Sequence, residues 1–323
     1  MLYRKLGISG LDISAISLGT WAFGSDSWWG HQESRDSFKT IEEALHRGVN
    51  LIDTAPVYGR GHAEEVLGEF FAKNYQRDKV ILATKAGLSW QERRIFHDLS
   101  EKKMLHEIDE SRRRLRTDYI DLYQVHWPDP AVPIAQTAAI MQKFLSSGII
   151  KAVGVSNFSI NQIEEFMKYC PVHCVQPEFS MFKRDAKEDI IPFCVKNNIG
   201  IISYAPLYSS ILTGKFFFED VKIPGDINRK IKKPELSEPR YSINKKALSY
   251  LKELADSRGY TLTQLALSWN FNHEGITSSI VGMRKSQQVS ENLSCLDFSM
   301  TAEELCSIDT ILNEREASLK NLV

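Results

Sequence analysis

Eight short apolar runs, most of them separated by stretches of helical periodicity, constrain the fold of this chain more than any other feature. The runs comprise residues 15–18, 49–52, 80–83, 120–125, 150–155, 173–175, 199–204 and 278–281. Apolar residues recur at helical spacing, with charged residues opposite, in segments 34–47, 63–73, 102–116, 134–147, 159–169 and 186–196. Strands that alternate with helices favour parallel pairing, because the crossover connections place the helices outside the sheet. The pattern predicts an α/β fold, with eight strands closed into a (β/α)8 TIM barrel.

A doubly wound open sheet is the competing architecture. Such a sheet normally carries a glycine fingerprint after its first strand. The nearest match here is Gly59 with Gly61, and no third glycine stands at the required position. The length of 323 residues would suit one barrel with insertions or two smaller domains. Because no linker or low-complexity tract interrupts the pattern, we expect a single domain over residues 1–323.

Some segments fall outside the repeat of strand and helix. Residues 3–14 predict a β-hairpin that plugs one end of the core. Residues 21–33 are rich in aromatic side chains and glycine, and residues 207–241 form a long stretch with three prolines. Long loops of this kind are usually lids or binding loops, and we expect them at the C-terminal face of the barrel. Additional amphipathic stretches cover residues 242–257, 261–272 and 301–313, the last one capped by Thr301.

Charge and cysteine content argue against several classes of protein. A net charge of −1 gives no general attraction to nucleic acid or to anionic membranes. Five scattered cysteines make no disulfide framework, and Cys170, His173 and Cys174 lack further ligands for a zinc site. The N-terminus lacks the apolar core of a signal peptide, and no run reaches the ~18 apolar residues of a membrane span. We expect a cytoplasmic protein without a metal that acts on a small molecule, with its oligomeric state left open.

Polar residues stand where the apolar runs end. They are Gly19, Thr20, Asp53, Lys85, His126, Ser156, Asn157, Gln176, Tyr204, Gly282 and Arg284. In a parallel barrel these ends open on one face, and that face holds the active site. The sequence therefore predicts a polar ring around the mouth of the barrel.

Asp53, Tyr58, Lys85 and His126 suggest a particular chemical device within this ring. A lysine ammonium beside a phenol lowers the phenol pKa, and a carboxylate behind the lysine orients it. Tyr58 could then act as a general acid, while His126 directs a carbonyl oxygen by hydrogen bonding. Because none of the four is a strong nucleophile, a hydride donor is the simplest complement. Metal-dependent hydrolysis would require clustered carboxylates or histidines, and only one of each stands here.

These residues also have structural interpretations. Asp53 could cap the turn that follows it, and His126 could be a core histidine. Tyr204 could pack at the rim of the barrel, while Arg284 and Lys215 could be exposed basic residues. The tryptophans of segment 21–33 could form a partner-binding patch.

Eight ordered motifs resemble those of the aldo-keto reductases. They are SLGT, LIDTAPVYG, LATK, DLYQVHWPD, GVSNF, VQPEFS, SYAPLYSSILTGK and VGMRKSQQVSENL. The resemblance covers the chain from the N-terminal hairpin to about Leu296. The resemblance implies that Asp53, Tyr58, Lys85 and His126 are the catalytic tetrad, with tyrosine as the acid in carbonyl reduction. It implies an enzyme that reduces aldehydes or ketones with NADP(H).

The resemblance also implies a set of cofactor contacts. Ser156, Asn157 and Gln176 match residues that bind the nicotinamide carboxamide, and Tyr204 matches the ring on which it stacks. The remaining matched positions are Gly19, Thr20, Trp21, Asp53, Leu207, Lys215, Gly282, Arg284, Gln288, Glu291 and Asn292. Arg284 favours NADPH, because a guanidinium binds a phosphate well. Some members have lysine at the position of Gly282 and arginine at that of Gln288, so use of both NADPH and NADH stays open.

Aromatic side chains are expected to line the substrate site. They are Trp21, Phe23, Trp28, Trp29, Tyr58, Trp90 and Trp127, with His126 beside them. Such walls accept many apolar carbonyl compounds. An alternative function within the resemblance is a cofactor-sensing accessory subunit of potassium channels, which keeps the barrel and the nucleotide with little turnover.

Overall fold

The computed structural model describes residues 1–25, 29–74, 77–92, 94–221 and 233–322. Eight parallel strands form a closed barrel, as predicted. In spatial order they are β3 (Ile16–Gly19), β4 (Leu51–Asp53), β5 (Ile81–Ala86), β8 (Ile120–Val125), β9 (Ile150–Ser156), β10 (Cys174–Gln176), β11 (Gly200–Ser203) and β12 (Ser278–Gly282). The pairing of β12 with β3, from Ser279 opposite Ile16 to Gly282 opposite Gly19, closes the ring.

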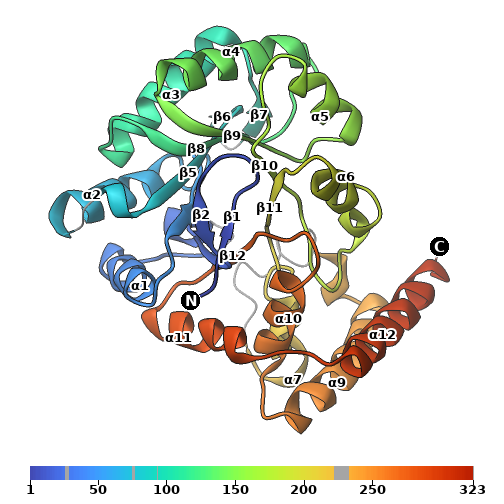
Figure 1. Cartoon of the computed structure of the whole chain (residues 1–323). Coiled ribbons are helices and arrows are strands. Elements are labelled where there is room, and N and C mark those ends of the chain that lie inside the picture. The colour runs from blue at the N-terminus through green and yellow to red at the C-terminus, as the bar shows by residue number, and fades with distance from the viewer. Residues whose placement is uncertain (26–28, 75–76, 93, 222–232, 323) are drawn as a thin grey trace.

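The helices surround the barrel (Figure 1). They are α1 (Ser34–His46), α2 (His62–Asn74), α3 (Glu101–Leu115), α4 (Ile134–Ser147), α5 (Ile160–Met167), α6 (Ile190–Lys196), α7 (Lys215–Phe218), α9 (Arg240–Ser257), α10 (Leu262–Phe271), α11 (Ser286–Leu293) and α12 (Ala302–Lys320). Ser159, Thr261 and Thr301 each start a helix with a reciprocal capping box, which satisfies backbone donors that the first helical turn leaves free.

Two predicted helix boundaries were wrong. Helix α6 begins at Ile190 instead of residue 186, because Asp185–Lys187 form a separate 3-10 helix and the Asp189 side chain accepts the Ile190 N–H. Helix α12 continues to Lys320 instead of ending at residue 313. Its polar last turns give little periodic signal, but Arg315 on the inner face is buried and extends the packed side of the helix.

The N-terminal hairpin plugs one end of the barrel, as expected. Its strands β1 (Tyr3–Lys5) and β2 (Asp12–Ser14) lie across the centre of the ring (Figure 1). Leu6 and Ile13 are fully buried and join inward-facing strand residues in one apolar cluster. Gly7 has a left-handed φ of 50°, and a Cβ there would lie 2.7 Å from the Gly200 nitrogen. This contact places the hairpin at the N-terminal ends of the strands.

A second hairpin, β6 (Leu88–Gln91) and β7 (Arg94–His97), follows β5 and was not predicted. Its polar composition hides the alternation on which strand recognition depends. The Arg60 guanidinium donates to the carbonyl of Glu92, which joins the hairpin tip to the loop after β4.

The expected long loop after β11 contains short ordered elements. These include the 3-10 helices Ile211–Thr213 and Pro234–Leu236 as well as α7, and α9 begins at Arg240 before the predicted loop end. The part of the loop at residues 222–232 lies outside the described residues. Among the described helices, none has the length and apolar character that crossing a membrane demands.

Candidate active site

The barrel brings Asp53, Tyr58, Lys85 and His126 together at its C-terminal end. Asp53 ends β4, Lys85 lies near the end of β5, and His126 directly follows β8. Lys85 Nζ donates to Asp53 Oδ1 at 2.6 Å, to the Thr54 carbonyl at 3.0 Å and to the Tyr58 hydroxyl at 3.4 Å. The His126 ring lies edge-on to the Tyr58 ring, with 6.1 Å between their centres. The Asp53 carboxylate is thus bound to Lys85 inside the barrel, and the interpretation of Asp53 as a turn cap does not hold.

Lys85 keeps its charge inside the barrel. Its side chain is fully buried, and burial alone would lower the pKa of an ammonium group. The Asp53 carboxylate and the Tyr58 phenol outweigh this effect and raise the pKa of Lys85. The site therefore holds a permanent cation beside the Tyr58 hydroxyl.

The expected effect on Tyr58 is corrected by the structure. The sequence predicted that Lys85 lowers the pKa of the phenol, but burial raises the pKa of Tyr58 above its usual value. The Lys85 ammonium opposes the increase, and the Asp53 carboxylate adds to it. The main physical reason is that a buried phenolate would lose its hydration. Asp53, which lies closer to Lys85 than Tyr58 does, also offsets part of the ammonium field.

His126 is held in its neutral form. Burial lowers the pKa of His126 well below the usual range, and the charges of Lys85 and His97 add to this effect. A neutral imidazole can donate one hydrogen bond and accept another. Such a ring can direct a carbonyl oxygen without adding charge to the site.

The three residues predicted to bind a carboxamide form a connected group with Tyr204, the predicted stacking ring, on adjacent strand ends. The Tyr204 hydroxyl donates to Asn157 Oδ1 at 2.9 Å, and Asn157 Nδ2 donates to the His126 carbonyl at 3.0 Å. Ser156 Oγ donates to the Gln176 carbonyl at 2.8 Å. The group links β9 and the loop after it to β10, to the end of β11 and to His126, so amide and hydroxyl groups lie beside the tetrad at the barrel mouth.

Arg284 is engaged by the loop that precedes α1. Its Nε donates to Gln32 Oε1 at 2.9 Å and its Nη1 to the Trp29 carbonyl at 2.6 Å, while Nη2 donates to the His31 carbonyl. Gln32 Nε2 returns a bond to the Arg284 carbonyl at 2.8 Å. Gln288 Oε1 accepts the backbone N–H groups at the start of α11. The guanidinium is therefore not a free surface cation.

The other residues predicted to bind cofactor lie around the same rim. Thr20 donates through its hydroxyl to the Asp53 carbonyl at 2.9 Å, which ties β3 to β4. Gly282 is exposed and has open space where a Cβ would stand. Asn292 is buried on α11, and Glu291 lies exposed beside it. Gly19 ends β3, while Leu207 and Lys215 lie in the segment that follows β11.

The predicted aromatic wall divides into two groups. Trp21 stacks on Tyr58 with 6.1 Å between ring centres and meets Trp29 edge-on at 5.7 Å. Trp127 lies 6.3 Å from the His97 ring, and Trp90 lines a separate cavity of about 170 Å³ against α3. The structure thus packs Trp21 against the Tyr58 ring and Trp29 against Trp21, whereas Trp90 packs beside α3. Phe23 is fully buried in the core, and Trp28 lies outside the described residues.

Comparison with known proteins decides the family. The model described as "Aldo/keto reductase family" matches residues 15–313. The chain belongs to the aldo-keto reductase family. It is therefore an oxidoreductase of a family that acts on small molecules and reduces carbonyl groups with nicotinamide cofactors.

Similar aldo-keto reductases cover almost the whole chain. "Aldo-keto reductase YhdN" of Bacillus subtilis (strain 168) is 39% identical over 97% of this chain and 94% of its own length. "NADH-specific methylglyoxal reductase" of Escherichia coli (strain K12) is 30% identical over 92% of this chain and 94% of its own length. The solved glycerol dehydrogenase AKR11B4 from Gluconobacter oxydans superposes with a TM-score of 0.87 at 36% identity, covering 97% of this chain and 95% of that chain.

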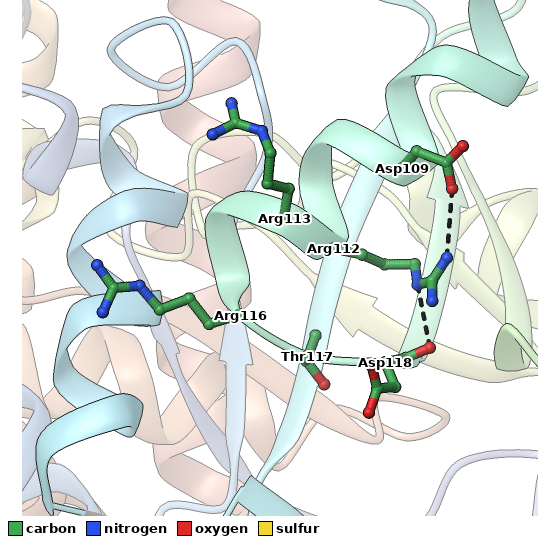
Figure 2. Close-up of a pocket in the computed structure, with 6 residues that line it drawn as sticks. All are labelled: Asp109, Arg112, Arg113, Arg116, Thr117 and Asp118. Atoms are coloured by element: carbon green, nitrogen blue, oxygen red, sulfur yellow. Dashed lines mark hydrogen bonds and ion pairs between the residues drawn. The ribbon is translucent and has the colours of Figure 1, made fainter.

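A second hollow, larger than the cavity beside Trp90, lies away from the tetrad. It measures about 350 Å³ and is lined by Asp109, Arg112, Arg113, Arg116, Thr117 and Asp118 at the C-terminal end of α3. Figure 2 shows Arg112 turned toward Asp109 and Asp118, with Arg113 and Arg116 pointing elsewhere. This hollow precedes β8 and lies at the opposite end of the barrel from the tetrad, so it is not the candidate active site.

One residue of the site was missed by the sequence analysis. Gln124 of β8 donates to Asp53 Oδ2 at 3.2 Å from inside the barrel. Gln124 could have been recognised from the sequence, because it is a polar residue in a mostly apolar strand and precedes His126 by two positions. Residues two apart on a strand share a face.

Proposed function

We propose that this aldo-keto reductase reduces aldehydes and ketones to alcohols with NADPH, and that Tyr58 supplies the proton. The observation that carries the proposal is the Lys85 ammonium, 2.6 Å from Asp53 Oδ1 and 3.4 Å from the Tyr58 hydroxyl. An ammonium beside a buried phenol stabilises the phenolate that remains after proton transfer. Asp53 holds this ammonium in place and keeps it charged.

The substrate carbonyl oxygen would accept hydrogen bonds from the Tyr58 hydroxyl and the neutral His126 ring. When bound, a nicotinamide cofactor supplies the hydride for the carbonyl carbon. The oxygen then carries negative charge and takes the Tyr58 proton, which gives an alcohol. Because the pKa of Tyr58 is raised, the phenol stays protonated at neutral pH, which is the form that reduction requires.

The side chains at the barrel mouth suit a nicotinamide. Ser156, Asn157 and Gln176 offer hydroxyl and amide groups for a carboxamide, which both donates and accepts hydrogen bonds. The half-buried Tyr204 lies next to them, and its hydroxyl bonds to Asn157. Gly19, Thr20, Leu207, Lys215, Gly282, Gln288, Glu291 and Asn292 remain proposed contacts of the rest of the cofactor. Trp21, Trp28, Trp29, Trp90 and Trp127 remain proposed walls of the substrate site.

Arg284 supports NADPH over NADH. A guanidinium has five N–H groups. Three of these donate to the Trp29–Gln32 segment, which leaves two for a 2′-phosphate. The charge of Arg284 would stabilise a phosphate more than a bare ribose. The segment bonds also orient the guanidinium before a ligand arrives.

Replacing Tyr58 with Phe tests the role of the acid. We expect NADPH oxidation with aromatic aldehydes, followed at 340 nm, to fall by a factor of about 10² or more, because the donated proton is lost. The dissociation constant for NADPH should change by less than about threefold, because the phenol oxygen is assigned no bond to the cofactor. Full retained activity would contradict the assignment. Cofactor binding without turnover in the unmodified protein would favour the accessory-subunit alternative.

The cofactor assignment is tested by a pair of variants. Arg284→Ala removes both the guanidinium and its bonds to the Trp29–Gln32 segment, whereas Gln32→Ala weakens the segment and leaves the guanidinium. We expect Arg284→Ala to weaken NADPH binding by about tenfold or more and NADH binding far less. Gln32→Ala should discriminate between the two cofactors much less than Arg284→Ala does, because the guanidinium stays and keeps its bonds to the Trp29 and His31 carbonyls. Equal losses in Arg284→Ala would remove the phosphate assignment without touching the role of Tyr58.

A further inference from the structure

Asp53 has a second oxygen whose partners lie on the other side of the barrel interior. Oδ1 accepts the Lys85 bond, and Oδ2 accepts N–H groups from Gln124 Nε2 at 3.2 Å and Gln176 Nε2 at 3.0 Å. Gln176 Nε2 also donates to Gln124 Oε1 at 3.0 Å. Asp53, Gln124 and Gln176, from β4, β8 and β10, therefore form a closed ring of hydrogen bonds, named here the amide ring.

The amide ring allows only one orientation of the Gln176 amide. An ionised carboxylate only accepts hydrogen bonds, so both glutamines must turn their NH2 groups toward Asp53. Both hydrogens of Gln176 Nε2 are then used, one on Asp53 Oδ2 and one on Gln124 Oε1. If the Gln176 amide turned over, its oxygen would face two other acceptors. The only side-chain polar atom that Gln176 can offer to a ligand is therefore its Oε1, an acceptor.

The barrel contains a space fitted to the Gln124 side chain. Gln124 is fully buried on β8, and its neighbour in the parallel register on β9 is Gly154. A Cβ at Gly154 would lie 2.8 Å from Gln124 Cγ and 3.3 Å from Gln124 Oε1. Gly154 thus leaves the volume that lets Gln124 reach both Asp53 and Gln176.

We propose that Gln124 is a positioning residue that, together with Asp53, engages both N–H groups of Gln176 and leaves Gln176 only as a hydrogen-bond acceptor, so that the site selects a pyridine cofactor whose ring substituent carries an amide N–H. This inference rests on the proposed function, in which the nicotinamide lies beside Gln176. A 3-acetylpyridine analogue of the cofactor keeps the carbonyl of the substituent but has no N–H. It would leave Gln176 Oε1 without a donor, and buried polar atoms without partners weaken binding.

The experiment measures the dissociation constants of the full-length protein for the reduced native cofactor and its 3-acetylpyridine analogue. The quantity of interest is the dissociation constant of the analogue divided by that of the native cofactor. In Gln124→Met, which keeps the length of the side chain and removes its amide, Gln176 Nε2 loses one of its two acceptors and keeps only Asp53 Oδ2. One N–H of Gln176 is then free, and a rotation of the amide can offer it to the carbonyl of the analogue. We expect the ratio to fall by about fivefold relative to the unmodified protein.

Ser203→Ala is the matched control, because Ser203 is a buried polar residue of the barrel that bonds to Asn270 outside the amide ring. It should leave the ratio unchanged, since a general loosening of the barrel weakens both ligands together. If Gln124→Met does not fold, Gly154→Ala gives the same test by crowding Gln124 out of the amide ring. An unchanged ratio in the folded variant, with native cofactor still bound, overturns the role of Gln124 alone. Failure of the unmodified protein to bind the native cofactor overturns the proposed function as well.

Discussion

At the scale of single residues, the site is governed by the competition between burial and charge. Asp53 and Lys85 form a buried ion pair, and each is supported by further hydrogen bonds inside the barrel. Buried charges require such partners, because an unpaired buried charge costs several kcal/mol. Burial of Tyr58 outweighs the field of the Lys85 ammonium and raises the pKa of the phenol, so its proton is held more tightly than that of a phenol in water.

The raised pKa of Tyr58 predicts different pH dependences for the two reaction directions. Reduction requires the protonated phenol, so kcat for reduction should not fall through loss of this proton between about pH 6 and about pH 9. Oxidation requires the phenolate, so its kcat should rise by about tenfold per pH unit over this range. Steady-state rates in both directions measure this. An oxidation rate that levels off near neutral pH would mean that the Tyr58 pKa is lowered after all.

Lys85→Met should move the rise of the oxidation rate to higher pH, because the Lys85 ammonium opposes the increase in the pKa of Tyr58.

At the scale of elements, α3 carries an acid that is buried against the end of β5. Glu107 accepts the Gly87 N–H at 2.9 Å, and burial raises the pKa of Glu107 to about 7, with Glu64 adding to the increase. The Gly87 bond and the cations Lys103 and Arg114 oppose it. Since Gly87 follows β5 by one residue, this contact attaches α3 to the strand that carries the lysine of the tetrad.

The raised pKa of Glu107 predicts that the fold becomes less stable as the pH increases. Between the usual pKa of 4.5 and about 7, the folded state binds the proton and the unfolded state has released it. The free energy of unfolding should therefore fall by about 3 kcal/mol over this window and stay level above it. Glu107→Gln keeps an oxygen for Gly87 and cannot ionise, so urea unfolding of this variant should lose that slope. An unchanged slope would assign the pH dependence to other groups.

At the scale of the whole molecule, the two ends of the barrel divide stability from chemistry. The N-terminal end is closed by Leu6 and Ile13 of the hairpin, and the C-terminal end carries the tetrad and the amide ring. Parallel strands make this division possible, because all their C-terminal ends meet on one face.

This division predicts that the hairpin can be weakened without loss of the site. Leu6→Ala removes a fully buried side chain and should lower the free energy of unfolding by about 2–5 kcal/mol. Ile8→Ala is the control, because Ile8 in the same hairpin is 60% exposed and should cost less than about 0.5 kcal/mol. Denaturant unfolding measures both values. Activity per folded molecule should stay unchanged in both variants, and its loss in Leu6→Ala would mean that the two ends are coupled.

The sequence by itself determined the eight strands, most of the helices, the N-terminal hairpin and the residues at the strand ends. These follow from local periodicity and from motifs in fixed order, which depend only on neighbours along the chain. Only the tertiary structure decided that Gln124 joins Asp53 to Gln176, that Arg284 binds the Trp29–Gln32 segment, and that Trp90 faces α3. It also reversed the expected pKa shift of Tyr58. Distances between different strands and the loss of water around a side chain arise only when the barrel closes, and both are absent from a linear pattern of residue types.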